Sequence, residues 1–240
     1  MASLTVTVLG SSGSYAGPGL ACSGYLVRCH GTAVWIDAGS GTLANLQRHV
    51  GLGDVDGIVL THEHPDHWSD VEGFSVASHH VHHLPPVPVW APAGLRRRLM
   101  MSARPFIWNE VGEASRIDIG PLAMVFSRTD HPVETLAVRV EGAGRALGYS
   151  ADTGPGWSLE ALGPGLDVAL CEATFLQDQE GLVQHMSARQ AGTSARRAGA
   201  RRLVITHLLP TIDRDLARAE AAAAFGGPVE VAHEGLEVQV

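Results

Sequence analysis

The sequence predicts an α/β fold in which two β-sheets pack face to face and helices cover the outside. Its 240 residues, 45% of them hydrophobic, can supply the core of one large domain. Short apolar runs alternate with helical stretches, and this order occurs in two successive halves of the chain. No linker, charge block or short-period repeat separates the halves, so we expect one domain over residues 1–240.

Strands dominate the first third of the sequence. The predicted strands cover residues 4–9, 24–29, 33–37 and 58–61. The turn at 30–32 joins the second and third of these as a hairpin. A helix is predicted over 40–50 from the helical spacing of its apolar residues, and a second helix over 70–83 ends before Pro85-Pro86.

The second half repeats this alternation. Its predicted strands lie near 87–90, 122–126, 136–140, 145–149, 167–171 and 203–206. Ser187 can cap a helix over 188–199, and the alanine-rich stretch 213–225 is helical until Gly226. Two further strands close the chain. Two β-rich halves, each followed by helices, predict two sheets with the helices outside.

The composition favours a metal-dependent protein over a nucleic-acid-binding protein. The formal net charge is −8, so no global basic field attracts a polyanion, although a small anion could still bind in a local pocket. Histidine is abundant, with 13 residues against 3 tyrosines. Three cysteines without a CxxC pattern fit a reducing compartment, and neither a signal peptide nor a membrane span is visible. We therefore expect a soluble cytoplasmic protein.

The stretch THEHPDHWSD, residues 61–70, follows a short apolar run and contains three histidines and three acids. Borderline transition metals prefer imidazole and carboxylate ligands together. His62 and His64 alternate, so they can point the same way from an extended loop, while Asp66 and His67 turn toward a second position. This stretch alone offers too few ligands for two metals.

Three later places put similar ligands after a strand or in a turn, at His131, Asp152 and His207. A carboxylate such as Asp152 can bridge two cations. Two such cations can polarise a phosphoryl or carbonyl oxygen and hold a hydroxide at neutral pH. A lone histidine after a strand is more often a packed or surface residue, but the HxHxDH spacing with three downstream partners favours a two-metal site.

HEHPDH resembles the HxHxDH signature of the metallo-β-lactamase superfamily, and the resemblance covers almost the whole chain. LGYSADTGP is similar to the superfamily's bridging-aspartate motif, and VITHLLP to its final histidine motif. DHPVETLAVRV, DVALCEATF and HMSARQAGTSARRAGARRLVITH resemble motifs of the ribonuclease Z-like subgroup. The resemblance implies an αββα sandwich, in agreement with the strand and helix pattern.

The resemblance also implies roles for individual residues. One metal would be held by His62, His64 and His131, and the second by Asp66, His67 and His207, with Asp152 bridging both. His185 would contact the scissile phosphate and protonate the leaving group, and Asp66 could orient a bridging hydroxide. Glu172 would support His185 or a ligand histidine as a hydrogen-bond acceptor. Zinc is the expected metal, with manganese or iron as alternatives.

The chain departs from the ribonuclease Z pattern in two places. Cys171 stands where the HEAT motif has a histidine, and no long insertion follows Gly154, where ribonuclease Z carries an arm that grips transfer RNA. A small phosphodiester is therefore the expected substrate. The segments GSSGSYAGPGLACSGYLV and IDAGSGTLANLQRHV look like actinobacterial members that convert 3′,5′-cyclic nucleotides to 5′-nucleotides. The alternatives are a lactonase or thioesterase, a tRNA 3′-processing endonuclease, and a non-catalytic metal-binding module.

Several other residues are candidates for supporting roles. Asp37, at the end of a predicted strand, is expected to orient a ligand histidine or to tie down a loop. Ser12 and Ser14 lie in a glycine-rich loop that could cover the site. His79 and His83 belong to a second histidine cluster that could contact substrate, although a solvated helix end is the favoured interpretation. The ribonuclease Z resemblance implies a homodimer.

Overall fold

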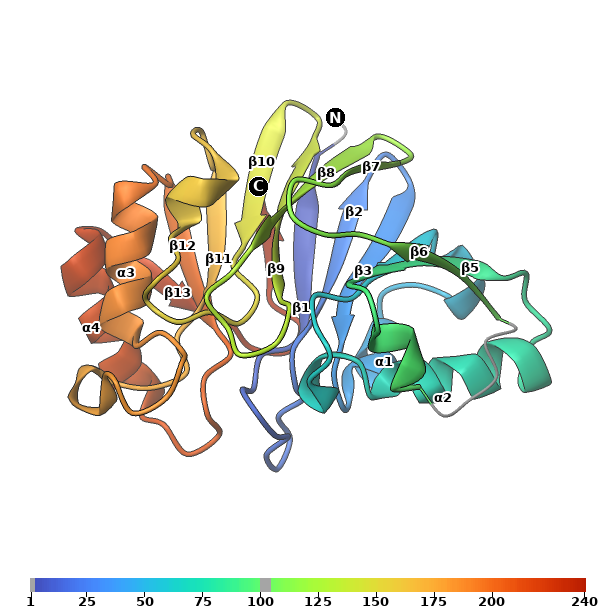
Figure 1. The fold of residues 1–240 in the computed structure, drawn as a ribbon, viewed down its shortest axis with the longest axis horizontal. Helices are drawn as coiled ribbons and strands as arrows, with labels where there is room; N and C mark the ends of the chain where they lie inside the picture. Colours follow the sequence, from blue (N-terminus) through green and yellow to red (C-terminus); the bar gives the residue numbers. More distant parts are fainter. Residues whose placement is uncertain (1–2, 100–104) are drawn as a thin grey trace.

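The computed structural model describes residues 3–99 and 105–240. Two seven-stranded sheets face each other, with α1 and α2 outside the first sheet and α3 and α4 outside the second (Figure 1). This arrangement confirms the predicted sandwich. None of the helices in the described part of the chain has the length and apolarity that a bilayer crossing requires.

The first sheet has the strand order β14-β1-β2-β3-β4-β5-β6. Its strands are β1 Thr5–Gly10, β2 Gly24–Cys29, β3 Thr32–Ala38, β4 Gly57–Val59, β5 Val87–Ala91, β6 Phe106–Glu110 and β14 Glu237–Gln239. Strands β1 to β3 pair antiparallel, whereas β3 to β6 run parallel. The predicted hairpin is present, because Cys29 pairs with Thr32 and both turn residues, His30 and Gly31, have positive φ.

The second sheet has the order β13-β12-β11-β10-β9-β8-β7. Its strands are β7 Arg116–Ile119, β8 Leu122–Arg128, β9 Leu136–Gly142, β10 Arg145–Tyr149, β11 Val168–Glu172, β12 Arg202–Thr206 and β13 Val229–Val231. Strands β7 to β10 pair antiparallel, and β10 to β13 run parallel. In each sheet the parallel strands therefore end at one common edge.

The core between the sheets is built from alternate strand residues of both halves. It contains Val6, Val8, Tyr25, Val27, Val34, Ile36, Phe126, Val138, Leu147, Tyr149, Leu170 and Val204, all at most 2% exposed. A second layer of mostly alanine and leucine lies under α3 and α4, and a third lies under α1 and α2. Burying these apolar groups is the main force that holds the sandwich together.

The helices are shorter than the sequence predicts at several ends. They are α1 Thr42–Leu46, α2 Asp70–Val76, α3 Ala188–Arg197 and α4 Arg214–Phe225. Where a helix is predicted over 40–50, α1 ends at Leu46 and a turn follows. Where one is predicted over 70–83, α2 ends at Val76 and a π-helix covers Ala77–Val81. Ser187 does cap α3, since its side chain accepts a hydrogen bond from the backbone of Gln190.

Two strands, β6 and β7, were missing from the sequence-based prediction. Both are edge strands, and each is hydrogen-bonded to one neighbour only. Their residues are largely half-buried or exposed and mix apolar with polar types, so neither forms an apolar run. Strands of this kind carry a weak sequence signal because one side of the ladder and much of one face remain in water.

Candidate metal centre

The candidate site lies where the parallel strands of both sheets end. The loop after β4 carries the HxHxDH residues, and His64 precedes a 3-10 turn over Pro65–His67. His131 lies in the loop between β8 and β9. Asp152 follows β10, and His207 follows β12. The fold therefore gathers these side chains from four loops at one edge of the sandwich.

A first cluster consists of His62, His64, His131 and Asp152. One nitrogen or oxygen atom from each lies within 4.8 Å of the others. His64 Nδ1 is 3.2 Å from His62 Nε2 and 3.1 Å from His131 Nε2. His62 Nε2 is 3.5 Å from Asp152 Oδ2. Three imidazole nitrogens and one carboxylate oxygen thus point at a common centre.

A second cluster consists of Asp66, His67, Asp152 and His207, again within 4.8 Å. Asp152 Oδ1 is 3.1 Å from His67 Nε2 and 3.3 Å from His207 Nε2. Asp66 Oδ2 is 3.3 Å from His207 Nε2. Asp152 turns its other oxygen toward the first cluster, so its carboxylate lies between the two groups.

The donor atoms fit divalent cations. His67 Nε2 and Asp152 Oδ1 are buried, and among the described residues neither has a hydrogen-bond partner of acceptable geometry. Buried polar atoms are normally paired, so both are available to another ligand. Burial alone would lower the pKa of His67, but the surrounding carboxylates of Asp152, Asp37 and Asp66 raise it well above its usual range. These carboxylates therefore favour a positive charge at this position.

His185 faces both clusters from the loop before α3. Its ring centroid lies 5.2 Å from that of His131 and 5.4 Å from that of His207. Its Nδ1 is 3.0 Å from Oε1 of Glu172, which is fully buried at the end of β11. Burial alone would lower the pKa of His185, but the hydrogen bond and charge of Glu172 raise it to about 9. The Glu172–His185 pair can therefore hold and donate a proton beside both clusters.

The comparisons with known proteins place this chain in a family. Residues 32–208 match a family described as the beta-lactamase superfamily domain, and this match includes all seven residues of the two clusters. The chain belongs to the metallo-β-lactamase superfamily. It is 35% identical to the protein Rv1339 of Mycobacterium tuberculosis, in an alignment that covers 99% of this chain and 93% of that protein.

Two further relatives indicate the subgroup of the superfamily to which the chain belongs. The crystal structure of the metallo-beta-lactamase fold protein YhfI from Bacillus subtilis superimposes with a TM-score of 0.93 at 27% identity, covering 99% of this chain and 100% of that one. Ribonuclease Z of Myxococcus xanthus is 26% identical in an alignment of 305 residues that covers 100% of this chain and 99% of that protein. These relatives agree with a ribonuclease Z-like member of the superfamily.

Asp37 lies behind the second cluster and contacts His67, and its role in orienting that histidine stays a prediction. Its Oδ2 lies 2.7 Å from His67 Nδ1, and Thr61 donates to both carboxylate oxygens at 2.9 Å. Tyr149, which the sequence analysis did not select, donates its hydroxyl to Asp37 Oδ2 at 2.8 Å. These bonds fix the ring of His67 so that Nε2 points into the cluster, the usual function of such supporting carboxylates in metal sites.

Replacing Asp37 by asparagine is expected to weaken metal binding by about 10- to 100-fold while the protein still folds. The asparagine amide would place an N–H₂ group, which cannot accept a hydrogen bond, beside Thr61, His67 and Tyr149, which now bond to the carboxylate. Competition with a chromogenic chelator measures the affinity. Asp56→Asn is the matched control, because Asp56 accepts a backbone hydrogen bond from Ala33 at the opposite end of β3. Equal affinity in Asp37→Asn and wild type would show that Asp37 does not support the metal centre.

Glu172 and Thr174 connect His185 to the second cluster. Glu172 accepts hydrogen bonds from Thr153 N at 2.5 Å and from the Thr174 hydroxyl at 2.7 Å. Thr174 Oγ1 also lies 2.9 Å from His207 Nδ1. Thr174 belongs to the CEATF motif but was not singled out, because a threonine beside a buried acid has no distinctive sequence signal. The bonds of Thr174 join Glu172 to His207.

The predicted substrate-contacting residues fall in two different places. Ser14 donates its backbone N–H to Asp66 Oδ2 at 2.9 Å, so its loop does lie against the second cluster. Ser12 lies in the same loop and is fully buried, and its contact with substrate stays a prediction. His79 and His83 lie in and just after the π-helix, where His83 Nδ1 bonds the backbone oxygen of His79. Their contact with substrate stays a prediction.

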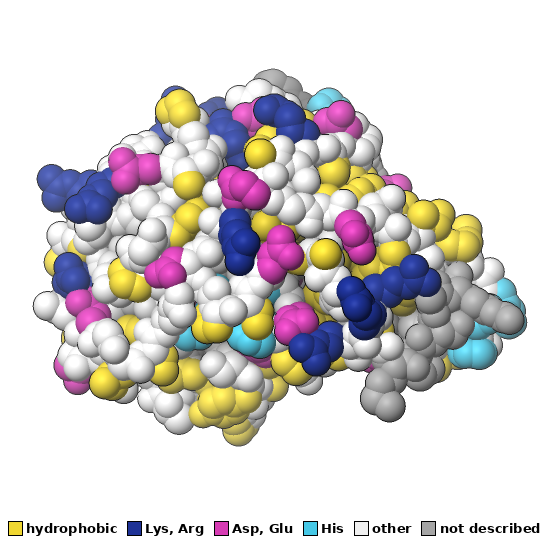
Figure 2. All heavy atoms as spheres, viewed as in Figure 1, with side chains coloured by type: hydrophobic (Ala, Val, Ile, Leu, Met, Phe, Trp, Pro, Cys, Tyr) yellow, Lys and Arg dark blue, Asp and Glu magenta, His cyan; other side chains and the backbone are white. Residues whose placement is uncertain are grey.

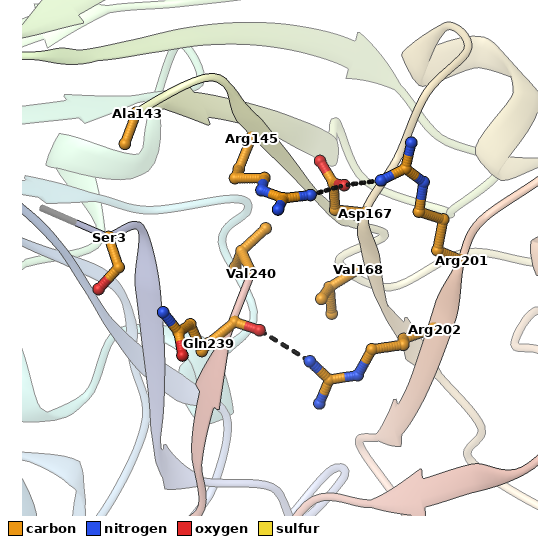
Figure 3. A pocket seen from close by; sticks show the side chains of 9 residues that line it. All are labelled: Ser3, Ala143, Arg145, Asp167, Val168, Arg201, Arg202, Gln239 and Val240. Carbon is orange, nitrogen blue, oxygen red and sulfur yellow. Dashed lines mark hydrogen bonds and ion pairs between the residues drawn. The ribbon is translucent and has the colours of Figure 1, made fainter. Parts of the chain in front are cut away.

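A cavity of about 620 Å³ lies away from this site, at the amino-terminal ends of β10, β11 and β12 (Figure 3). Asp167 Oδ1 accepts from Arg145 and Arg201, both at 2.9 Å. Arg202 donates to the backbone oxygen of Gln239 at 2.7 Å. The guanidinium groups in this cavity are thus held by neighbouring acceptors, and the ligand-type histidines lie at the other end of the strands.

Proposed function

We propose that this protein is a binuclear metal-dependent phosphodiesterase that hydrolyses a small phosphodiester, with a 3′,5′-cyclic nucleotide as substrate and a 5′-nucleotide as product. The position of His185 carries the proposal. It faces both clusters at ring distances of 5.2 and 5.4 Å, and buried Glu172 fixes its ring. An alkoxide is a poor leaving group, so cleavage of an alkyl phosphodiester benefits from a positioned acid in this place.

The two clusters would each hold one divalent cation, zinc first, with manganese or iron as alternatives. His62, His64 and His131 would hold one ion, Asp66, His67 and His207 the other, and Asp152 would lie between them. Bound cations offset the charge on phosphate oxygens and make a hydroxide available at neutral pH. Without such charge compensation, the three carboxylates around His67 would repel an anionic substrate.

Two residues of the chain would then orient the nucleophile and supply a proton to the leaving group. Asp66, held by the backbone N–H of Ser14, would orient the attacking hydroxide at phosphorus. As the bond from phosphorus to the ribose 3′-oxygen breaks, His185 would give its proton to that oxygen. Both groups act on charge that develops in the transition state, where stabilisation increases the rate.

A small substrate is favoured over transfer RNA. The chain passes from Asp152 to the short 3-10 helix Leu159–Leu162 without an inserted arm. The alignment with ribonuclease Z runs over 305 residues, whereas this chain has 240, so the relative contains segments that this chain lacks. On the face drawn in Figure 2, arginines and acids are interspersed, and the net charge is −8. The homodimer and the cytoplasmic location stay predictions.

A chromatographic product assay on zinc- and manganese-loaded protein with 3′,5′-cyclic AMP tests this function. We expect formation of 5′-AMP, and bis-p-nitrophenyl phosphate serves as a generic phosphodiester. Absence of product from cyclic AMP at full metal occupancy would reject the cyclic-nucleotide assignment and direct the search to lactones, thioesters and other phosphodiesters. A loaded protein that hydrolyses none of these would be a metal-binding module.

A further inference from the structure

Asp130 joins three loops around the site. Its Oδ1 accepts a hydrogen bond from the side-chain amide of Gln184, in the loop before α3. Its Oδ2 accepts one from the backbone N–H of Gly156 at 2.9 Å, in the loop after β10. Asp130 itself belongs to the loop after β8, next to His131. One carboxylate therefore ties together the three loops from the second sheet that carry His131, Asp152 and His185.

Two glycines of the loop after β10, Gly154 and Gly156, lie close against the Asp130 side chain. A Cβ atom on Gly154 would lie 2.7 Å from Asp130 Oδ2 and 2.9 Å from Cγ of Gln184. A Cβ atom on Gly156 would lie 2.6 Å from the same carboxylate oxygen. At distances this short a side chain would displace the Asp130 carboxylate or the Gln184 side chain, so glycine at both positions lets the loop close over the Asp130–Gln184 bond without disturbing it.

The bond between Asp130 and Gln184 runs beside the ring contact between His131 and His185. Each member of the bond directly precedes one of these histidines in the chain, and the rings lie 5.2 Å apart. The loop before α3, which carries Gln184 and His185, is also anchored by an ion pair between Glu180 and Arg189 of α3, at 2.7 Å. Between these anchors, Leu182 and Val183 are 74% and 56% exposed and supply little packing of their own.

We propose that Gln184 and Asp130 are positioning residues, whose hydrogen bond sets the place of His185 relative to His131 and thereby its access to the leaving group. This inference rests on the proposed phosphodiesterase function. Glu172 fixes the direction of the imidazole through Nδ1, and the Asp130–Gln184 bond fixes the backbone that carries it. A misplacement of about 1 Å in a catalytic group can cost on the order of 100-fold in rate.

The test compares leaving groups in a charge-matched pair of variants. Gln184→Glu places a carboxylate against Asp130, and the two repel. The double variant Asp130→Asn with Gln184→Glu restores the bond, because an asparagine amide can donate to the glutamate while its oxygen still accepts from Gly156. Gln184 is exposed, so we expect both proteins to fold. Gln179→Ala, at an exposed position of the same loop, is the control.

We expect Gln184→Glu to lower kcat for 3′,5′-cyclic AMP by about 10- to 100-fold with little change in KM. Hydrolysis of bis-p-nitrophenyl phosphate should be nearly unchanged, since p-nitrophenolate leaves without a proton. The double variant should recover most of the loss, and hydrogen exchange in residues 176–186 should rise only in the single variant. If Gln184→Glu lost the same factor on both substrates, or lost nothing while the wild type is active, the positioning role would be wrong but the proposed function would stand. A wild type inactive on both substrates would overturn the function as well.

Discussion

Replacing Asp152 by asparagine is expected to remove at least one metal ion per chain and to lower phosphodiester turnover by at least about 100-fold. Asp152 is 2% exposed and contributes an oxygen to each cluster. The neutral amide would offer one oxygen in place of two and would set an N–H₂ group against imidazole nitrogens or a cation. Since three histidine nitrogens lie within 3.1 to 3.5 Å of this carboxylate, no other described side chain can take over its central place.

Metal content per chain, measured by elemental analysis after exhaustive dialysis, checks the first part of this expectation, and the rate with cyclic AMP checks the second. Asp167→Asn is the matched control, because Asp167 directly precedes β11 at the far end of the strands, where it pairs with Arg145 and Arg201 (Figure 3). If Asp152→Asn kept two ions and the wild-type rate, the carboxylate would not bridge a binuclear centre.

The parts of the fold that could be predicted are those with strong local patterns. Strands such as 24–29 and 203–206 are apolar runs with turn residues at their ends, and the structure has strands within one residue of both. The edge strands β6 and β7 were not predicted, because their partners contribute as much to their stability as their own residues do. The π-helix after α2 was also absent from the prediction, since nothing in local spacing distinguishes it from a continued α-helix.

The candidate site shows a similar division between local pattern and long-range contact. The HxHxDH spacing and the family motifs selected seven residues, and the structure brings all seven into two adjoining clusters. Tyr149 and Asp37 are 112 residues apart, and Asp130 and Gln184 are 54 apart. Hydrogen bonds over such separations depend on how the two sheets pack, so a single sequence without its fold does not reveal them.

Replacing His185 by alanine is expected to separate chemistry from metal binding. We expect a loss of about 100- to 10,000-fold in the rate with 3′,5′-cyclic AMP, which is the usual contribution of a general acid or base. Both metal ions should remain bound, because His185 contributes to neither of the two clusters built around Asp152. His233→Ala, which removes an exposed histidine, is the control for the loss of an imidazole.

The leaving group decides what the loss at His185 means. An acid is required for a ribose 3′-alkoxide but not for p-nitrophenolate, so His185→Ala should hydrolyse bis-p-nitrophenyl phosphate at a rate much closer to wild type. A residue that only binds the phosphate would affect both substrates alike, because both share the phosphodiester group. Equal losses on the two substrates would therefore assign His185 to binding. Unchanged rates on both would show that the Glu172–His185 pair stands outside the reaction despite its position beside both clusters.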